Sequence, residues 1–248
     1  MSFSLTVKPV ADCIAELCTL DEEGEPAKSA YLRNTEWGKD ILVEWGKKTP
    51  KGEYKSGVNH IVDRRMTQGL TLDETAFVFV CALDAAQSVQ PQELKNKRLF
   101  ERFGVRAVVA ENSPTYRPLI TGFIITPKHK KGAGETAAPN AGTQPYALNE
   151  LARTQEVVAA LSSAVSRFDS IVKQNPADWE KIIENEIEML RIKQESIFDA
   201  VFMKAPNGAP TNLTERQWLT VRTQTFKAWF GDWENTPENA SKVVDENG

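Results

Sequence analysis

Three short apolar runs that lie close together in the chain constrain its fold more than any other feature. The segment "RLFERFGVRAVVAE" contains two β-compatible runs separated at Gly104, and "PLITGFIITP" supplies a third that closes at Pro127. β-Branched and aromatic residues favour strands, and a glycine between two such runs favours a tight turn. The pattern predicts an antiparallel β-meander.

A helix is predicted immediately before these strands. In "TLDETAFVFVCALDAA", Thr71 precedes Glu74 by the spacing of a capping box, and a mostly apolar run follows. Such a run suits a buried helix, although a strand over residues 77–81 also fits it. Helices packed on a small antiparallel meander give an α+β fold, which is the fold class that the sequence predicts.

The later part of the chain has a helical period. Large apolar residues recur at helical spacing over 148–171 and again over 179–202, and "QNPADW" around Pro176 interrupts the pattern. These stretches predict a helical hairpin. Their apolar stripes are more often core or partner-binding surface than cofactor sites, so we assign no chemistry to them.

Changes in composition divide the chain into four parts. "KHKKGAGETAAPNAGTQP", residues 128–145, is typical of a flexible linker, and "KAPNGAPTN", residues 204–212, contains residues that stop a helix. We therefore predict a nuclease-like α+β domain over 1–127, the linker over 128–145, a helical interaction region over 146–204 and an aromatic-rich tail over 205–248.

Composition also limits the classes of partner. The 248-residue chain has a net charge of -4, so contact with nucleic acid would need a local basic patch. Its three cysteines form neither a disulfide framework nor a zinc-binding pattern, which favours a reducing compartment. The longest apolar run, "AFVFVCAL", is too short to span a membrane, and the start lacks a signal-peptide pattern. We expect no membrane partner.

The histidine in "GVNHIVDRRM" is the first candidate for chemistry. Cleaving RNA without a metal requires a base for the 2′-hydroxyl, an acid for the leaving oxygen and cations for the phosphorane. In a helix, His60 and Arg64 share one face, and a phosphate fits between them. Ile61 and Val62 are available to anchor that helix. Taken alone, the pattern favours a solvated helix face on which Asp63 pairs with a neighbouring arginine.

Other polar residues also have ordinary explanations. Arg98, Arg102 and Arg106 fit outward-facing positions on strands. His129 lies in the predicted linker and lacks the rigid support that a catalytic residue needs. Glu111, at the end of its strand, is a further proton-transfer candidate, but nothing local distinguishes it from a solvated carboxylate.

A family resemblance covers residues 54–127, about a third of the chain. "SGVNHIVDRR", the helical run after it and "FGVRAVVAENSPTYRPLITGFIITP" resemble phage-encoded nuclease-like domains of the barnase/EndoU/colicin/RelE-like superfamily. In those domains a helix bearing "HI-x-x-R/K-H" precedes a sheet that ends in a "T-A/G-F" strand. The resemblance implies helices on an antiparallel sheet and a metal-independent ribonuclease site that uses no cofactor.

The resemblance also implies roles for individual residues. His60 corresponds to the family histidine, the general base or acid, and Arg64 to the basic residue that follows it. Arg106 corresponds to the strand arginine that faces the phosphate, and Thr121 to the hydrogen-bonding residue that opens "TGF". Arg65 departs from the pattern, because similar domains often have a second histidine there. An arginine cannot act as a base, although it still stabilises an anion.

The tail carries a second resemblance. "RTQTFKAWFGDWENTPENASKVVDENG", residues 222–248, is similar to a segment of large multidomain phage and prophage proteins that usually leads into a toxin-like or ADP-ribosyltransferase-like domain. Its aromatic residues recur at helical spacing, which more often marks a docking surface than a ligand cage. These residues are Phe226, Trp229, Phe230 and Trp233.

The sequence therefore predicts a phage or prophage protein that cleaves RNA in the host bacterial cytoplasm and is virion-associated before delivery. The main alternative is a catalytically inactive phage structural or host-directed protein that binds a partner, or self-associates, through its helical region. The missing second histidine supports that alternative. A DNA-binding regulator is a third class, and the acidic balance and the lack of a basic recognition helix argue against it.

Overall fold

The computed structural model describes residues 4–19, 27–46, 54, 56–111, 117–125 and 150–198. The predicted linker over 128–145, including His129, lies outside these residues. So do the predicted turn over 204–212 and the aromatic-rich tail over 205–248. The predictions for these segments stay predictions.

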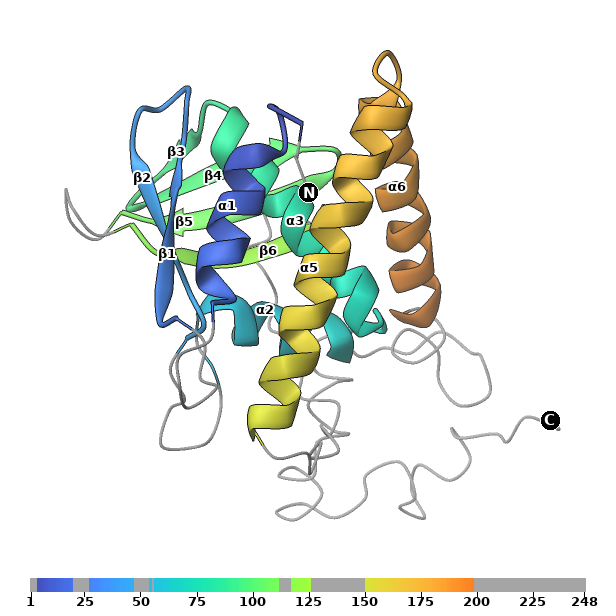
Figure 1. The fold of residues 1–248 in the computed structure, drawn as a ribbon, viewed down its shortest axis with the longest axis horizontal. Helices are drawn as coiled ribbons and strands as arrows, with labels where there is room; N and C mark the ends of the chain where they lie inside the picture. Colours follow the sequence, from blue (N-terminus) through green and yellow to red (C-terminus); the bar gives the residue numbers. More distant parts are fainter. Residues whose placement is uncertain are drawn as a thin grey trace, which may run out of the picture.

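The predicted meander is a four-stranded antiparallel sheet in the order β3-β4-β5-β6 (Figure 1). Its strands are β3 (Gln92–Leu94), β4 (Lys97–Arg102), β5 (Val105–Ala110) and β6 (Leu119–Ile124). Phe103 and Gly104 form the turn between β4 and β5, and both have positive φ, as a two-residue type I′ turn requires. The three predicted strands are confirmed, and the short β3 adds a fourth.

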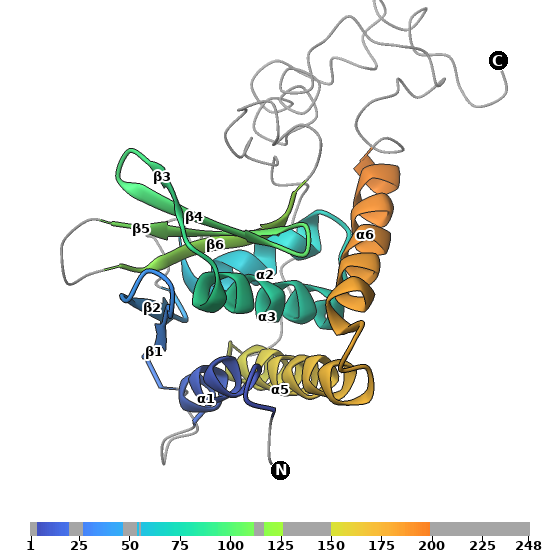
Figure 2. The same cartoon turned by 90° about the horizontal axis from the view of Figure 1, so that it is seen from above.

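Helix α3 (Leu72–Ser88) lies across one face of this sheet. The Glu74 backbone N–H donates to the Thr71 hydroxyl at 3.3 Å, and the Thr71 N–H donates to the Glu74 carboxylate at 2.8 Å. The predicted helix and its capping box are therefore confirmed. Figure 2 shows the sheet on one side of α3 and helices α1 (Lys8–Leu17) and α5 (Glu150–Gln174) on the other. This position between two layers explains the nearly continuous apolar sequence of α3.

The two faces of the four-stranded sheet have different neighbours. A Cβ placed on Gly122 would lie 2.7 Å from the Cβ of Ala82 in α3, so Gly122 faces α3. Side chains alternate along a strand, so Thr121 and Phe123 belong to the opposite face. In Figure 2, none of the described helices lies flat across that face. Helix α2 (Gly57–Thr67) packs against β6, and we call the Thr121 and Phe123 side of the sheet its outer face.

A separate two-stranded antiparallel sheet consists of β1 (Ser29–Arg33) and β2 (Asp40–Glu44). Neither these strands nor α1 was predicted from the sequence. An isolated bridge pairs Leu42 with Pro118, and the Leu42 N–H donates to the Arg117 carbonyl oxygen at 2.9 Å. The small sheet is thus attached to the chain just before β6.

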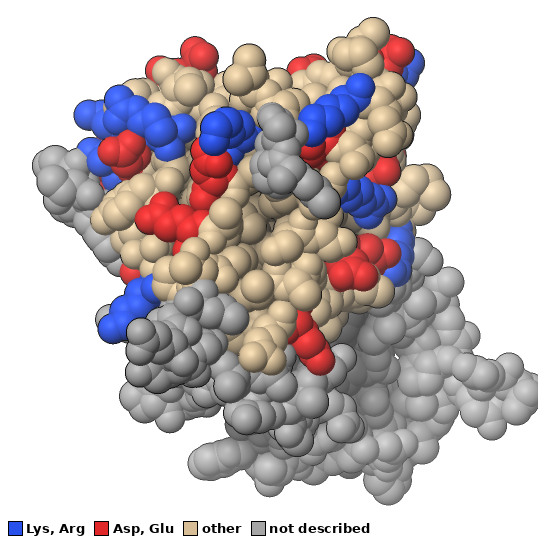
Figure 3. Space-filling view, in the orientation of Figure 1, with Lys and Arg blue, Asp and Glu red and all other residues tan. Residues whose placement is uncertain are grey.

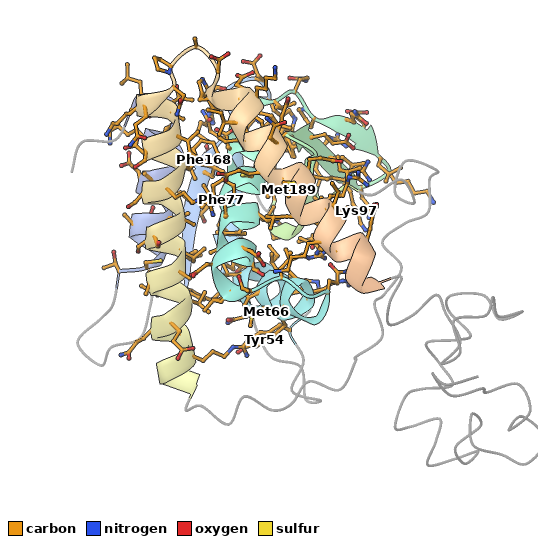
Figure 4. All side chains as sticks on the ribbon, turned by 90° about the vertical axis from the view of Figure 1, so that its right-hand side faces the viewer. Tyr54, Met66, Phe77, Lys97, Phe168 and Met189 are labelled. Carbon is orange, nitrogen blue, oxygen red and sulfur yellow. The ribbon has the colours of Figure 1, made fainter. Side chains whose placement is uncertain are left out.

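The predicted helical hairpin consists of α5 and α6 (Trp179–Phe198). Phe168 of α5 lies with its ring centroid 6.4 Å from that of Phe77, 6.2 Å from that of Phe103 and 6.0 Å from that of Trp179. Figure 4 shows Phe77 and Phe168 in the space between α3 and α5. The hairpin therefore shares one hydrophobic core with α3 and the sheet.

Arg98 and Arg102 do not face outward, so that alternative is wrong. Arg102 donates to Asp84 of α3 at 2.9 Å and to Glu180 of α6 at 2.6 Å, which joins three elements. Burial raises the pKa of Asp84 to about 6, against the opposing effect of Arg102. Arg98 pairs with Glu111 at 2.5 Å, so this strand-end carboxylate has a fixed partner.

The described part of the chain confirms the predicted α+β class, with helices on an antiparallel meander and a helical hairpin after it. None of the described helices combines the length and the apolar character that a membrane span would need.

Candidate functional site

Helix α2 carries three of the predicted site residues. Val58, Ile61 and Val62 are at most 2% exposed and fix this helix in the core. The predicted helix and its two predicted anchors are therefore confirmed. Their burial orients α2, so the directions of its polar side chains follow from its helical geometry.

The His60 ring forms a hydrogen bond with the backbone of Tyr54. Its Nδ1 lies 2.8 Å from the backbone carbonyl oxygen of Tyr54. A carbonyl oxygen only accepts hydrogen bonds, so Nδ1 carries the proton in this contact, and in the neutral ring Nε2 keeps the lone pair. His60 is half-buried. Figure 4 shows Tyr54 and Met66 at the α2 end of the molecule. This tautomer leaves Nε2 as the nitrogen that can accept a proton.

Arg64 lies one helical turn after His60 and is also half-buried. Arg64 and Arg65 occupy the last turn of α2, where the helix dipole favours positive charge. Asp63 forms its ion pair with Arg153 of α5. Within the described part of the chain, the expected pairing of Asp63 with a neighbouring arginine is therefore wrong. Its charge serves to hold α2 against α5.

Arg65 is one of the few charged residues in the interior, with 2% of its surface exposed. Its Nη1 donates to Gln68 Oε1 at 2.6 Å. Its guanidinium carbon lies 5.5 Å from the ring centroid of Phe123 on β6. A cation at this distance over an aromatic face is attracted by the ring. Arg65 therefore links α2 to the outer face of the sheet.

Arg106 reaches the same aromatic ring from β5. It stands opposite Phe123 in the strand register, and its guanidinium carbon lies 5.8 Å from the ring centroid. On its other side it stands opposite Glu101 and donates from Nε to the Glu101 carboxylate at 2.6 Å. The guanidinium also pairs with this carboxylate through Nη2. Arg106 thus belongs to the outer face of the sheet, and a phosphate would have to compete with Glu101 for it.

Thr121 lies on the same face of β6 as Phe123 and is 2% exposed. Its hydroxyl is buried and has no hydrogen-bond partner among the residues that the structure describes. An unsatisfied buried hydroxyl is uncommon, because desolvating it without a partner costs about 1–3 kcal/mol. We refer to Arg65, Glu101, Arg106, Thr121 and Phe123 together as the Phe123 cluster.

The predicted site residues form two groups. Arg65, Arg106 and Thr121 belong to the Phe123 cluster, whereas His60 and Arg64 share another side of α2. Residues five apart on an α-helix differ in direction by about 140°, so His60 and Arg65 point to different sides of α2. The convergence of His60 and Arg106 on one phosphate stays a prediction.

Two members of the cluster were not singled out from the sequence, namely Phe123 and Glu101. A signal for Glu101 was present. A two-residue turn at Phe103 and Gly104 fixes the register of the hairpin, and this register sets Glu101 opposite Arg106. The contact of Arg65 with Phe123 depends on how α2 packs against β6, which no local pattern specifies.

Comparisons with protein-family models, with curated proteins and with solved structures found no match to this chain.

Proposed function

We propose that this protein is a phage-derived endoribonuclease that cleaves RNA in the host bacterial cytoplasm without a metal ion. The observation that carries the proposal is the hydrogen bond between His60 Nδ1 and the Tyr54 carbonyl oxygen. It fixes the tautomer in which Nε2 can accept a proton, and an arginine follows one turn later on the same side of α2. Cleavage of a phosphodiester by its own 2′-hydroxyl requires a base, an acid and a cation, and in this proposal one imidazole serves as both base and acid beside the cation.

In the proposed reaction, His60 Nε2 takes the proton of the 2′-hydroxyl. The 2′-oxygen forms a bond to phosphorus, the bond from phosphorus to the 5′-oxygen breaks, and the imidazolium returns its proton to the departing 5′-oxygen. The products are a 2′,3′-cyclic phosphate and a free 5′-hydroxyl. The guanidinium of Arg64 stabilises the negative charge on the phosphorane oxygens.

We further propose that the Phe123 cluster, on another side of α2, contributes to RNA binding. Arg65 and Arg106 provide positive charge, and the buried hydroxyl of Thr121 provides a hydrogen-bond donor. Figure 3 shows that the face drawn there, which carries α1 and α5, has acidic and basic side chains in alternation. Such a mixed surface attracts RNA weakly, so binding depends on a local site.

The proposal is tested by incubating end-labelled RNA with purified protein in the presence of a chelator. His60→Gln removes the base but keeps a side chain that can donate to the Tyr54 carbonyl, so we expect cleavage to fall about 100-fold or more. Arg106→Ala should weaken RNA binding with a smaller effect on the maximal rate. Lys8→Met, an exposed position on α1, serves as the matched control and should cleave like the native chain.

Cleavage that persists in both His60→Gln and Arg106→Ala would come from another site or a contaminant and would contradict the proposal. Absence of cleavage in the native chain would contradict it as well, and would favour the second candidate function.

That second candidate is a phage structural or host-directed protein that binds a partner or itself through its helical region. One specific observation favours it. On α6, Met189 is 67% exposed and Ile192 is 49% exposed, and the two lie three residues apart on one side of the helix. Replacing both with Asp should abolish self-association or partner binding in sedimentation measurements, because a charged stripe does not pack against an apolar surface.

A further inference from the structure

Arg117, just before β6, is a buried cation with no anionic partner among the described residues. It is 8% exposed, and its Nε is buried without a hydrogen-bond partner. Nε is the one nitrogen of its guanidinium that is both enclosed and without a hydrogen-bond partner among the described residues. Buried charges in proteins are normally paired, so an unpaired guanidinium calls for an explanation.

Arg98, which lies near the same aromatic ring as Arg117, provides a comparison. The guanidinium carbons of Arg98 and Arg117 lie 5.9 Å and 5.6 Å from the ring centroid of Trp37. Arg98 is balanced by two carboxylates, Glu111 at 2.5 Å and Glu93 at 3.1 Å. Arg117 shares the aromatic ring but has no such carboxylate in the described part of the chain. The positive charge of Arg98 is therefore compensated by carboxylates, whereas that of Arg117 is not compensated within the described part of the chain.

The aromatic ring is held in place by the hairpin between β1 and β2. Asn34 is fully buried, and its side-chain amide donates to the carbonyl oxygens of Ala86 at 2.6 Å and Val89 at 2.9 Å. Its side-chain oxygen accepts the backbone N–H of Trp37. These bonds attach the hairpin turn to the end of α3, and Trp37 packs on Phe100 of β4 with ring centroids 5.9 Å apart.

The backbone of Arg117 is fixed as well. Its carbonyl oxygen accepts the Leu42 N–H of β2 at 2.9 Å, and the next residue, Pro118, pairs with Leu42. A binding group that is held on both sides by regular structure loses little entropy when a ligand arrives. Trp37 and Arg117 therefore form a rigid pair.

We propose that Arg117, beside Trp37, is a binding site for an oxyanion, either a phosphate or a carboxylate group of a ligand. The terminal nitrogens of a guanidinium form two parallel hydrogen bonds with either group. Arg98, which lies near the same ring, is balanced by its own carboxylates. Phe123 lies six positions after Arg117, which is about 20 Å along an extended chain, so this site is distinct from the Phe123 cluster.

The test measures the thermal stability of the native chain against increasing inorganic phosphate, and in a parallel arm against acetate, at constant ionic strength. Phosphate at about ten times its dissociation constant should raise the Tm by about 3–6 °C, and the rise should saturate. A saturable rise with acetate but not with phosphate would assign the site to carboxylate ligands.

Arg117→Met should lose the saturable rise, and Arg117→Lys, which keeps the charge but not the two parallel bonds, should show a smaller one. One control should keep it in full, namely Arg33→Met, an exposed arginine on β1 that pairs with Asp40. If Arg117→Met does not fold, the comparison of Arg117→Lys with Arg33→Met decides. The proposal is overturned if neither anion gives a saturable rise in the native chain, or if the Arg117 variants keep the full rise.

Discussion

At the scale of single residues, the partners of each arginine indicate whether its role is structural or a candidate for function. Arg102 is held by Asp84 and Glu180, and its role in joining α3, β4 and α6 is structural. Arg106 has a carboxylate partner but also faces Phe123 together with Arg65. The sequence marked Arg65 and Arg106 as candidates from a family resemblance, but it could not distinguish the pairing states of the arginines, because these depend on strand register and helix packing.

The first prediction concerns Glu101, which competes with phosphate for Arg106. Glu101→Gln removes the charge but keeps a hydrogen-bond acceptor, so RNA affinity should rise about 3-fold or more at low salt, in a filter-binding or anisotropy assay. Glu93→Gln removes a carboxylate from Arg98, outside the Phe123 cluster, and should leave affinity unchanged. An equal gain in both variants would show that only net charge matters and would remove Arg106 from the binding surface.

The second prediction concerns the pH dependence set by Asp84. Its folded-state pKa is raised from 3.8 to about 6 by burial, so the folded protein holds this proton more tightly than the unfolded chain. The corresponding stability is fully present below pH 3.8 and is lost as pH rises through about 6, by roughly 3 kcal/mol. Asp84→Asn should remove this loss, measured as the difference in urea unfolding between pH 4.5 and pH 7.

Asp169 gives a control with the opposite sign. Burial opposes its ionisation, but the hydrogen bonds from Lys173 and Ser4 outweigh burial and lower its pKa. Its contribution is present above the unfolded pKa and is lost as pH falls, so Asp169→Asn should reduce the acid sensitivity of the protein. If Asp84→Asn has the same pH profile as the native chain, the link between Asp84 and stability is wrong.

At the scale of elements, the sequence predicted the helix start and the turn that short motifs specify. The Thr71 and Glu74 capping box begins α3, and the turn at Phe103 and Gly104 joins β4 to β5. The strands β1 and β2 were missed because their segment lacks a strong alternation. They are stabilised mainly by distant contacts, such as those of Asn34 with the end of α3 and of Leu42 with Arg117.

The third prediction concerns the close packing of β6 against α3. Gly122→Ala places a methyl group 2.7 Å from the Cβ of Ala82, so the two elements must separate, at a cost of about 1–3 kcal/mol in the free energy of unfolding. Adding Ala82→Gly in the same chain should recover part of that loss, although a glycine inside a helix costs about 1 kcal/mol by itself. Denaturant unfolding of the two single variants and the double variant measures this coupling. If the effects of the two substitutions on the free energy of unfolding simply add, residues 82 and 122 do not clash sterically.

At the scale of the whole molecule, α5 and α6 complete the core that the sheet and α3 begin. Phe168 illustrates this, because it contacts aromatic rings from α3, from the turn before β5 and from the start of α6. The helical period predicted the hairpin and its break near Pro176. It could not predict which face of the hairpin meets α3, because several apolar faces of similar character are available.

The fourth prediction follows from this shared core. Phe168→Ala should lower the free energy of unfolding by about 3–5 kcal/mol, and circular dichroism and tryptophan fluorescence should still report one coincident transition. Ser162→Ala, an exposed position on the same helix, is the matched control and should change little. Two separate transitions, with only the later one shifted by Phe168→Ala, would show that the hairpin folds as a unit of its own.

The account depends most on contact between RNA phosphate and the His60 and Arg64 side of α2. The most direct measurement follows the imidazole NMR signals of the chain's two histidines during titration with a 2′-O-methyl RNA oligonucleotide, which binds but cannot be cleaved. His60→Gln identifies the His60 signal by its loss. We predict that this signal shifts saturably and that Arg64→Met weakens the response. If the His60 signal stays unchanged while backbone signals elsewhere respond, RNA binds away from α2 and the proposed function is wrong.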